Sequence, residues 1–381
     1  MVSLMKVEKI TLHNFRNIKQ QEIKFADGVN LICGQNARGK TNVLEAIYAF
    51  ARGKSFRAAS ERELVRFKTR GYNTELVYSD RRRTQSLTLG YEDKKRLKKI
   101  NGVPCDRLSD MIGRFCAVLF CPEHLDIVKG GPGQRREFLN IAISQLDPVY
   151  ISAQAKYKAV LEERNALIRK LSFCEDEIQK KMLLTQLDIF SEQMAAASAY
   201  ICLAREKYIR ALSPYAEFYL GEMSRGKEKL TLGYECDVDP ACREDEGLCA
   251  EQYLKKFTEN VEREISTGAT IYGVHRDDIA ININNIDARS YASQGQQRSI
   301  ALALKMAEGE CAREIIGEYP VFLFDDVLSE LDENRRAYLF SRTEGKQVIM
   351  TSCEMEEFTG QFRPARIIKA MSPGEFGVRL K

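Results

Sequence analysis

The stretch LICGQNARGKTNVLEA, residues 31–46 of this 381-residue chain, decides how the fold is built. A short apolar run ends at Gly34, and the pattern Gly-x4-Gly-Lys-Thr is completed by Lys40 and Thr41. Apolar residues then recur at helical spacing, and Gly53 is placed to end the helix. The stretch therefore predicts a strand, a loop bounded by glycines and a helix, in that order.

A loop of this composition between a strand and a helix is typical of phosphate binding. Glycine lacks a Cβ atom, so backbone N–H groups can turn toward an anion, which the N-terminus of the following helix also attracts. We expect Lys40 to contact the β- and γ-phosphates of a nucleotide and to assist catalysis, and the Thr41 hydroxyl to bind Mg²⁺. The alternative, a Gly-rich turn beside an exposed lysine, is disfavoured by the strand-loop-helix context. The predicted nucleotide-binding residues of the loop are Gly34, Gln35, Asn36, Ala37, Arg38, Gly39, Lys40 and Thr41.

The composition is typical of a globular, water-soluble chain, with 44% hydrophobic and 29% charged residues. A net charge of +4 permits a basic patch without requiring nucleic acid as a partner. There is no run of 18 apolar residues, so no transmembrane helix is expected, and the N-terminus lacks the features of a secretory signal. Because a secretory signal is not apparent and the eleven cysteines are an odd number, a reduced, cytoplasmic location is favoured. The absence of a C-x-x-C pair disfavours a zinc site.

The order of strand-like and helical segments predicts one domain interrupted by another. Strand-like runs and turns fill the first 120 residues, helical periodicity follows, and strand signals then return. We therefore predict an α/β head formed by residues 1–125 and 262–381. A helical insertion domain is expected over residues 126–261.

The helical region, residues 133–222, contains two successive runs of apolar residues at helical spacing. This pattern predicts two long antiparallel helices with a turn near residues 172–176. Pro214 and Gly221 mark the expected end of the region, because neither residue favours the interior of a helix.

The segment VFLFDD, residues 321–326, supplies the acidic groups that a P-loop nucleotide site needs. Its apolar residues predict a strand buried on both faces of a parallel sheet, and ligands bind at the C-terminal ends of such strands. We expect Asp325 to hold Mg²⁺ or its waters, and Asp326 to orient and deprotonate the attacking water. Two acids after a strand are also common surface residues, and the P-loop is what favours the catalytic interpretation.

Two further segments narrow the class of P-loop protein. The run SQGQQR, residues 293–298, precedes a predicted helix and offers a hydroxyl, a glycine N–H and a helix N-terminus to a γ-phosphate. The alternative is a polar turn that only caps the helix. The run SELD, residues 329–332, follows the acidic pair directly.

The order of these motifs resembles the ATP-binding-cassette heads of the structural-maintenance and double-strand-break repair ATPases, and in particular the RecF family. The similar segments, in the same order, are ITLHNFRNI, GQNARGKTNVLEAIY, INGVPCDRLSDMIGRFCAVLFCPEHLDIVKGGPGQRREFLN, GVHRDDI, SQGQQRSIALALKMAE and FLFDDVLSELDENRR. The resemblance covers nearly the whole chain and is weakest over residues 150–260. It implies an ABC-type ATPase head, a P-loop fold with a mixed sheet and a β-rich lobe, interrupted by an α-helical insertion.

The resemblance also implies how the nucleotide site is completed. ATP is sandwiched between two heads in such proteins, so Ser293, Gly295 and Gln296 would contact nucleotide held by the P-loop of a second copy. Arg16 would lie near the nucleotide, and Asp332 would belong to the dimer interface.

The sequence departs from the pattern of related ATPases at several positions. Ala37 stands where many P-loops have a third glycine, and Asp326 is shorter than the glutamate of cassette transporters, which predicts slow hydrolysis. Glu123 occupies the neighbourhood of the usual glutamine loop and offers only a contact to Mg²⁺ or water. Thr351 or Ser352 can supply only a hydrogen bond where transporters carry a histidine. The HRDD element, residues 275–278, matches the family without indicating a chemical role.

By the same resemblance, ATP and Mg²⁺ hold two heads together as an ATP-dependent homodimer that clamps duplex DNA near gaps. Weak, DNA-stimulated ATP hydrolysis would then release the clamp. The implied setting is DNA replication and recombinational repair in the cytoplasm, without a membrane. RecR is the implied partner, with RecO and RecA in the same pathway, and the implied outcomes are RecA loading and the SOS response.

Two basic runs are candidates for contact with DNA phosphates. For an isolated charge run the alternative is a solvated hairpin face. No stacking aromatic residues are interleaved with them, which favours duplex DNA over single strands. The candidate DNA-binding residues are Arg81, Arg82, Arg83, Lys94, Lys95, Lys98 and Lys99.

Three other classes of protein are alternatives at this stage. A transporter ATPase subunit is disfavoured by the helical insertion and by the missing switch histidine. A chromosome-structural protein with coiled-coil arms is disfavoured because roughly 90 helical residues at ~1.5 Å each, folded back, are too short for long arms. A P-loop kinase would leave residues 293–298 unexplained.

Overall fold

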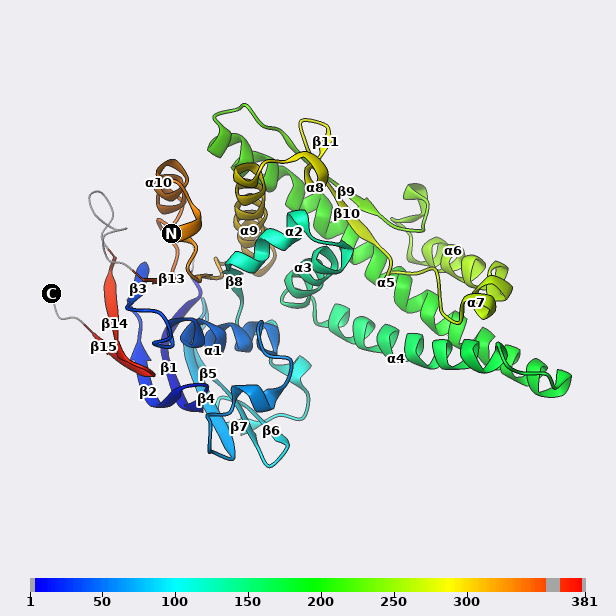
Figure 1. Cartoon of the computed structure of the whole chain (residues 1–381), viewed down its shortest axis with the longest axis horizontal. Coiled ribbons are helices and arrows are strands. Elements are labelled where there is room, and N and C mark those ends of the chain that lie inside the picture. The colour runs from blue at the N-terminus through cyan, green and yellow to red at the C-terminus, as the bar shows by residue number, and fades with distance from the viewer. Residues whose placement is uncertain (1–3, 354–363, 379–381) are drawn as a thin grey trace. The chain divides into compact units, whose positions relative to one another are not determined.

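The structure, a computed structural model, describes residues 4–353 and 364–378. Its contacts divide the chain into two compact units (Figure 1). The first unit contains residues 1–128, 215–229 and 292–381, and the second contains residues 129–214 and 230–291. The division expected from the sequence differs in three segments, because it assigned 126–128 and 215–229 to the insertion and 262–291 to the head.

The first unit contains a six-stranded sheet that is parallel except at one edge. Its strands are β3 (Val29–Cys33), β8 (Ala117–Phe120), β12 (Val321–Phe324), β13 (Val348–Ser352), β14 (Arg366–Ser372) and β15 (Glu375–Val378). Their order is β15-β14-β3-β13-β12-β8, and only β15 pairs antiparallel. Every residue of β3, β8, β12 and β13 is buried, as expected for parallel strands covered on both faces.

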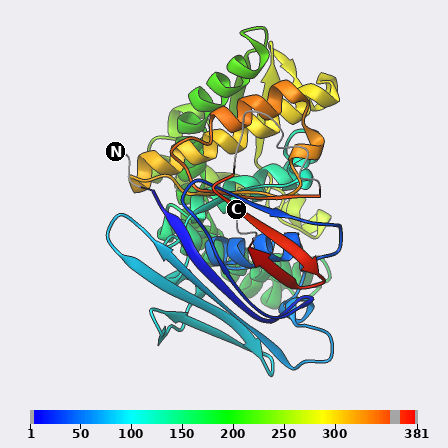
Figure 2. The same ribbon diagram turned by 90° about the vertical axis from the view of Figure 1, so that its left-hand side faces the viewer.

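A second, antiparallel sheet belongs to the same unit and appears as blue to cyan arrows in Figure 2. Its strands are β1 (Lys6–Phe15), β2 (Ile18–Lys24), β4 (Gly71–Ser79), β5 (Thr84–Glu92), β6 (Lys95–Ile100) and β7 (Val103–Pro104). They pair in the order β2-β1-β4-β5-β6-β7. The strand-like runs expected in the first 120 residues are thus confirmed, as is the mixed α/β class with a β-rich part.

Three helices of the first unit bear on the site: α1 (Lys40–Arg52), α9 (Gln294–Ile316) and α10 (Glu333–Ser341). The shorter elements are α2 (Asp126–Lys129), η1 (Glu61–Leu64), η2 (Leu108–Asp110), η3 (Pro122–Leu125) and η5 (Leu328–Glu330). Gly53 ends α1 as expected, because its φ of 78° lets its N–H bond to Ala49 O at 2.8 Å. A Cβ atom at Gly309 would lie 2.3 Å from the Phe322 ring, so glycine lets α9 approach β12 closely.

The second unit is mainly helical. Its elements are α3 (Pro132–Ser144), α4 (Pro148–Leu171), β9 (Leu230–Glu235), η4 (Pro240–Cys242), α6 (Glu246–Glu259), α7 (Val261–Thr267), β10 (Asp278–Ile283), β11 (Ile286–Asp287) and α8 (Ala288–Tyr291). The longest helix, α5 (Glu177–Ser224), begins in this unit and pairs with α4 as the predicted long hairpin (Figure 1). Near the turn the two helices share a core of Leu167, Ile168, Leu171 and Leu187.

The predicted end of the helical region near Pro214 and Gly221 is wrong, because α5 continues through both residues to Ser224. A proline inside a helix costs ~3 kcal/mol. Contacts beyond it offset that cost: the buried Tyr219 hydroxyl donates to Glu310 at 2.7 Å, and Arg342 pairs with Glu222 at 2.9 Å. In the described part of the chain, no helix combines the length and hydrophobicity that crossing a membrane requires.

Candidate nucleotide site

Three neighbouring parallel strands bring the predicted site residues to one edge of the sheet. β3 leads into the P-loop at Gly34, and Asp325 directly follows the last residue of β12. β13 pairs with both of them and carries Thr351 near its C-terminal end. The strand order therefore brings together groups about 300 positions apart in the sequence, at the edge where parallel sheets bind ligands.

The backbone of the P-loop adopts conformations that favour glycine. Gly34 and Gly39 have φ angles of 150° and 97°, and a Cβ atom at either position would lie 2.8 Å from a neighbouring oxygen. Ala37 also has a positive φ, 63°, in the left-handed region where an L side chain costs roughly 1–2 kcal/mol. The missing third glycine is thus tolerated at some conformational cost.

Lys40 is buried and lies over the loop. Its Nζ atom donates hydrogen bonds to Gly34 O at 2.5 Å and Gln35 O at 3.1 Å. Together with Asp326, Thr351 and Arg57 it lines a hollow of about 190 Å³. The other residues that line this P-loop hollow are Asn36, Ala37, Arg38, Gly39, Thr41, Asn42 and Cys353.

A chain of hydrogen bonds joins the P-loop to the acidic pair. Thr41 and Thr351 both donate through Oγ1 to Asp325 Oδ1, at 2.9 and 2.8 Å. Thr351 Oγ1 also accepts the backbone N–H of Asp326 at 2.9 Å, and Asp326 has a left-handed φ of 53°. Burial raises the pKa of Asp325 above its usual value, although the bonds from Thr351 and Thr41 act in the opposite direction. Of the two residues expected to supply a hydrogen bond here, Thr351 thus makes its bonds to the acidic pair.

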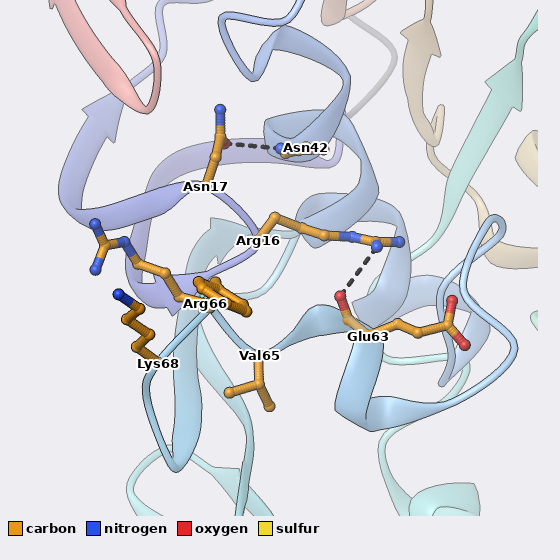
Figure 3. Close-up of a pocket in the computed structure, with 8 residues that line it drawn as sticks. Arg16, Asn17, Asn42, Glu63, Val65, Arg66 and Lys68 are labelled. Carbon is orange, nitrogen blue, oxygen red and sulfur yellow. Dashed lines mark hydrogen bonds between the residues drawn. The ribbon is translucent and has the colours of Figure 1, made fainter.

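Arg16 lies in a second, larger hollow rather than in the P-loop hollow. This second hollow has a volume of about 700 Å³ and is lined by Arg16, Asn17, Asn42, Glu63, Val65, Arg66, Phe67 and Lys68 (Figure 3). Asn42 lines both hollows and donates to Asn17 Oδ1 at 2.8 Å. The Arg16 guanidinium bonds to Glu63 O at 3.0 Å, as Figure 3 shows, and to the buried carboxylate of Glu45.

Sequence reasoning did not identify Arg57 and Glu45 as site residues. Arg57 follows α1, lines the P-loop hollow and bonds to Glu45 and to Asn42 Oδ1. No spacing rule marks either residue, because their relation depends on side-chain contacts between a helix and the loop after it.

Ser293 caps α9. Within a single chain, the segment therefore has the geometry of the alternative interpretation, a polar turn that caps the helix. The Ser293 hydroxyl accepts the N–H of Gln296 at 3.3 Å, and the Gln296 side chain accepts the N–H of Ser293 at 2.8 Å. Arg335 of α10 bonds to Gly295 O, Ser299 Oγ and Asp332. Residues 293–298 are not among the described residues that line the P-loop hollow of the same chain.

The HRDD element lies in the second unit and makes internal contacts there. Asp277 pairs with Arg205 at 2.7 Å, and Asp278 with Arg135 at 2.6 Å. His275 Nδ1 accepts the Tyr157 hydroxyl at 2.6 Å. Its role in the described structure is therefore to tie this unit together.

Glu123 and the basic runs lie away from the P-loop hollow. Glu123 is exposed and does not line it in the described residues. The exposed residues 81–83 form the turn from β4 to β5, whereas Lys94 lies in the turn at the other end of β5. Lys98 and Lys99 of β6 pair with Leu89 and Thr88 in the middle of β5, so the candidate DNA-binding residues are spread along this part of the sheet.

Comparison with known proteins gives similarity over the whole chain. The sequence matches the family described as RecF/RecN/SMC N terminal domain over residues 6–372. It is 36% identical over 373 residues to the DNA replication and repair protein RecF of Staphylococcus epidermidis, and the match covers 97% of this chain and 99% of that protein. A solved structure of "the recombination mediator protein RecF-ATPrS in RecFOR pathway" has a TM-score of 0.91 at 33% identity and covers 99% of each chain. The corresponding RecF-ATP structure has a TM-score of 0.89 at 33% identity, covering 100% of this chain and 99% of that one.

Proposed function

This chain belongs to the RecF family of DNA replication and repair proteins, and we propose that it is an ATPase that binds DNA as an ATP-dependent homodimer in recombinational repair. The observation that carries the proposal is the hydrogen-bond chain Thr41–Asp325–Thr351–Asp326. It joins the P-loop after β3 to the acidic pair after β12, two strands away in the same sheet, which is the arrangement that nucleoside triphosphate hydrolysis requires.

The residues present fit a Mg²⁺ ion beside the nucleotide. Thr41 and Asp325 offer a hydroxyl and a carboxylate oxygen 2.9 Å apart, and Mg²⁺ prefers such oxygen ligands. Because burial raises the pKa of Asp325, a cation would favour its charged form. When bound, Mg²⁺ neutralises charge on the phosphate oxygens.

The hydrolytic step rests on Asp326. Asp326 lines the P-loop hollow, as Lys40 does, and its carboxylate would accept the proton of the attacking water there. Lys40 would leave the loop carbonyls and contact the β- and γ-phosphates instead. Its ammonium group would then donate to charged phosphate oxygens in place of neutral carbonyl oxygens, which gives stronger hydrogen bonds. The short side chain of Asp326 supports a slow turnover, which we propose DNA accelerates.

The second hollow suits the nucleoside part of ATP. It meets the P-loop hollow at Asn42 and combines the apolar Val65 and Phe67 with amide and guanidinium groups. Binding sites for small molecules commonly mix apolar walls with a few polar groups in this way. Phe67 is 82% exposed, so its ring is available to stack on a base.

Capping by Ser293 is compatible with a contact to a second copy. The hydroxyl accepts one N–H at the helix end, and its own proton remains free to be donated to a γ-phosphate. Gly295 and Gln296 would add contacts at the same helix N-terminus. We propose that this segment completes the site of the partner molecule.

The proposed dimer clamps duplex DNA near gaps, through the basic residues of the turns at the two ends of β5 and of β6. Such contacts to phosphates are sensitive to salt and largely independent of base sequence. Similarity to structures described within the RecFOR pathway supports RecR as a partner, with RecO and RecA in the same pathway, and a role in RecA loading and the SOS response in the cytoplasm.

The test is filter binding of the chain to duplex, gapped and single-stranded DNA with ATP, ADP or no nucleotide. We expect ATP to strengthen binding to duplex or gapped DNA, and Asp326→Asn to prolong the ATP-bound complex because hydrolysis is slowed. Lys40→Ala should remove the effect of ATP. Lys158→Ala, which removes the same charge from the exposed face of α4, is the matched control and should behave as the wild type. Equal binding with ATP, ADP and no nucleotide would contradict the proposal.

A further inference from the structure

Glu45 is a completely buried carboxylate in the helix that begins at the P-loop. Its exposed fraction is 0%, and both of its oxygens are used. Arg16 donates through Nη2 to Oε1 at 2.7 Å and through Nε to Oε2 at 3.0 Å. Arg57 Nη2 donates to Oε2 at 2.8 Å, and the Ser55 hydroxyl to Oε1 at 2.5 Å. Two arginines from different parts of the chain thus share one carboxylate.

The charge of Glu45 is held by these partners. Burial alone would raise its pKa, but the hydrogen bonds from Arg16, Ser55 and Arg57 outweigh burial and lower the pKa below its usual value. A buried carboxylate without such partners would be costly, because its desolvation is not compensated. If one arginine is removed, the other must therefore compensate the buried negative charge of Glu45 without it.

The two arginines line different parts of the nucleotide site. Arg16 lies in the turn between β1 and β2 and lines the second hollow, whereas Arg57 follows α1 and lines the P-loop hollow. Their guanidinium-bearing side chains are 22% and 34% exposed, so each combines a buried contact to Glu45 with access to a ligand. Asn42 reinforces the link, since it accepts from Arg57 at 2.6 Å and donates to Asn17 at 2.8 Å.

We propose that Glu45 is a positioning residue for ATP binding, which holds Arg16 and Arg57 as one unit and so couples the contacts made to the nucleoside to those made to the phosphates. This inference rests on the proposed function, because it assigns the two hollows to the two parts of one nucleotide. Loss of either arginine would let the other shift on the shared carboxylate. The affinity of the site would then fall for both parts of the ligand together.

A different result is expected if Glu45, Arg16 and Arg57 form an ion-pair cluster that only stabilises the fold. Such a cluster would change stability when altered, and the effects of the two arginines on ATP affinity would be independent. Groups without shared partners have additive effects, whereas groups in one network show interaction energies. A double-mutant cycle on ATP binding therefore separates the two possibilities.

The experiment measures the Kd of ATP by isothermal titration calorimetry for the wild type, Arg16→Ala, Arg57→Ala and the double variant. Each single variant should raise Kd, and the double variant should raise it by about three-fold to tenfold less than the product of the single effects. The same cycle in a Glu45→Gln background should become additive. An additive cycle in the wild-type background would overturn the inference, and this arm does not require Glu45→Gln to fold.

One control variant and the ATP affinity of the wild type show which claim a negative result would overturn. Glu264→Gln alters another completely buried arginine–carboxylate pair, with Arg164 in the second unit, and should lower the melting temperature without changing the Kd of ATP. If the wild type itself failed to bind ATP, the proposed function would be wrong. If the wild type bound ATP and the cycle were additive, only the coupling by Glu45 would be wrong.

Discussion

At the scale of single residues, one hydroxyl group links the two acids of the site. Thr351 donates to Asp325 and accepts the N–H of Asp326, whose left-handed backbone conformation needs such a contact. We expect Thr351→Val to lower kcat for ATP hydrolysis by about 10- to 100-fold, since a hydrogen bond to a charged group contributes roughly 1.5–3 kcal/mol. The Kd of ATP should change little, because Thr351 is placed to orient the acids rather than to hold the triphosphate. Single-turnover hydrolysis and calorimetry measure the two quantities.

Two variants control for the loss of a buried hydroxyl as such. Thr351→Ser keeps the hydroxyl and should retain most of kcat. Thr74→Val removes a buried hydroxyl that donates to Leu89 O at 2.8 Å in the antiparallel sheet, and should leave kcat unchanged. A parallel loss of kcat and stability in Thr351→Val, without recovery in the serine variant, would assign Thr351 a structural role only.

The site residues that the sequence predicted belong to a local motif, whereas those it missed are defined by contacts between residues far apart in the sequence. Lys40 and Thr41 were found because the P-loop pattern is local and has a fixed spacing. Glu45 sits four positions after Thr41, where an acid on a helix is ordinarily interpreted as solvent-exposed. Its burial depends on Arg16 and Arg57, and nothing in their spacing indicates a shared contact.

At the scale of elements, the strands and the long hairpin were predictable because their apolar periodicity is strong. The continuation of α5 past Pro214 was not, since it depends on tertiary contacts that outweigh local propensity. The position of β13 between β3 and β12 was not predictable either. That position explains why Thr351, rather than a residue near the acidic pair in sequence, completes the site.

The HRDD element gives a prediction about pH. His275 accepts the Tyr157 hydroxyl at Nδ1 and contacts Thr270 O through Nε2, a pair of bonds that suits the neutral ring. Burial lowers the pKa of His275 to about 4, from the 6.5 of an unperturbed histidine. The unfolded state therefore binds more protons at His275 between these values, and the contribution of His275 to folding stability should fall by about 3 kcal/mol as the pH drops from 6.5 toward 4. The neighbouring Asp277 acts in the opposite direction, because burial raises its pKa to about 6, so the effect of His275 is measured as a difference between variants.

Thermal unfolding near neutral pH and near about pH 5 measures this effect. The melting temperature of the wild type should decrease toward acid, and His275→Gln should show a smaller decrease from a lower starting value. His13, which is exposed in β1, provides the matched control through His13→Gln. An equal acid-induced decrease in the wild type and His275→Gln would show that the neutral ring is not what the fold requires.

At the scale of the whole molecule, the P-loop hollow and the Ser293 segment, which we propose are the two halves of a nucleotide site, are not joined within the described chain. The P-loop hollow is complete on its own strands, whereas Ser293 and its helix N-terminus lie outside it. A two-fold homodimer would use each surface twice, so that each P-loop meets the Ser293 of the other copy. This arrangement predicts that a chain with a damaged P-loop and a chain with a damaged Ser293 segment together form one intact site in a mixed dimer.

Lys40→Ala disables the P-loop, and Ser293→Arg disables the N-terminus of α9. Each variant alone should lack ATP-dependent association and hydrolysis, the first because its P-loop fails and the second because the bulky cation blocks the helix end. Because neither variant forms a dimer alone, the dimers of an equimolar mixture should all be mixed, with one intact composite site out of two, so up to about half of wild-type ATPase activity should return. Gel filtration with ATP should show a dimer only in the mixture. Full activity of Ser293→Arg alone, or an inactive mixture whose Ser293→Arg member still binds ATP, would show that Ser293 does not act on the nucleotide of a second copy.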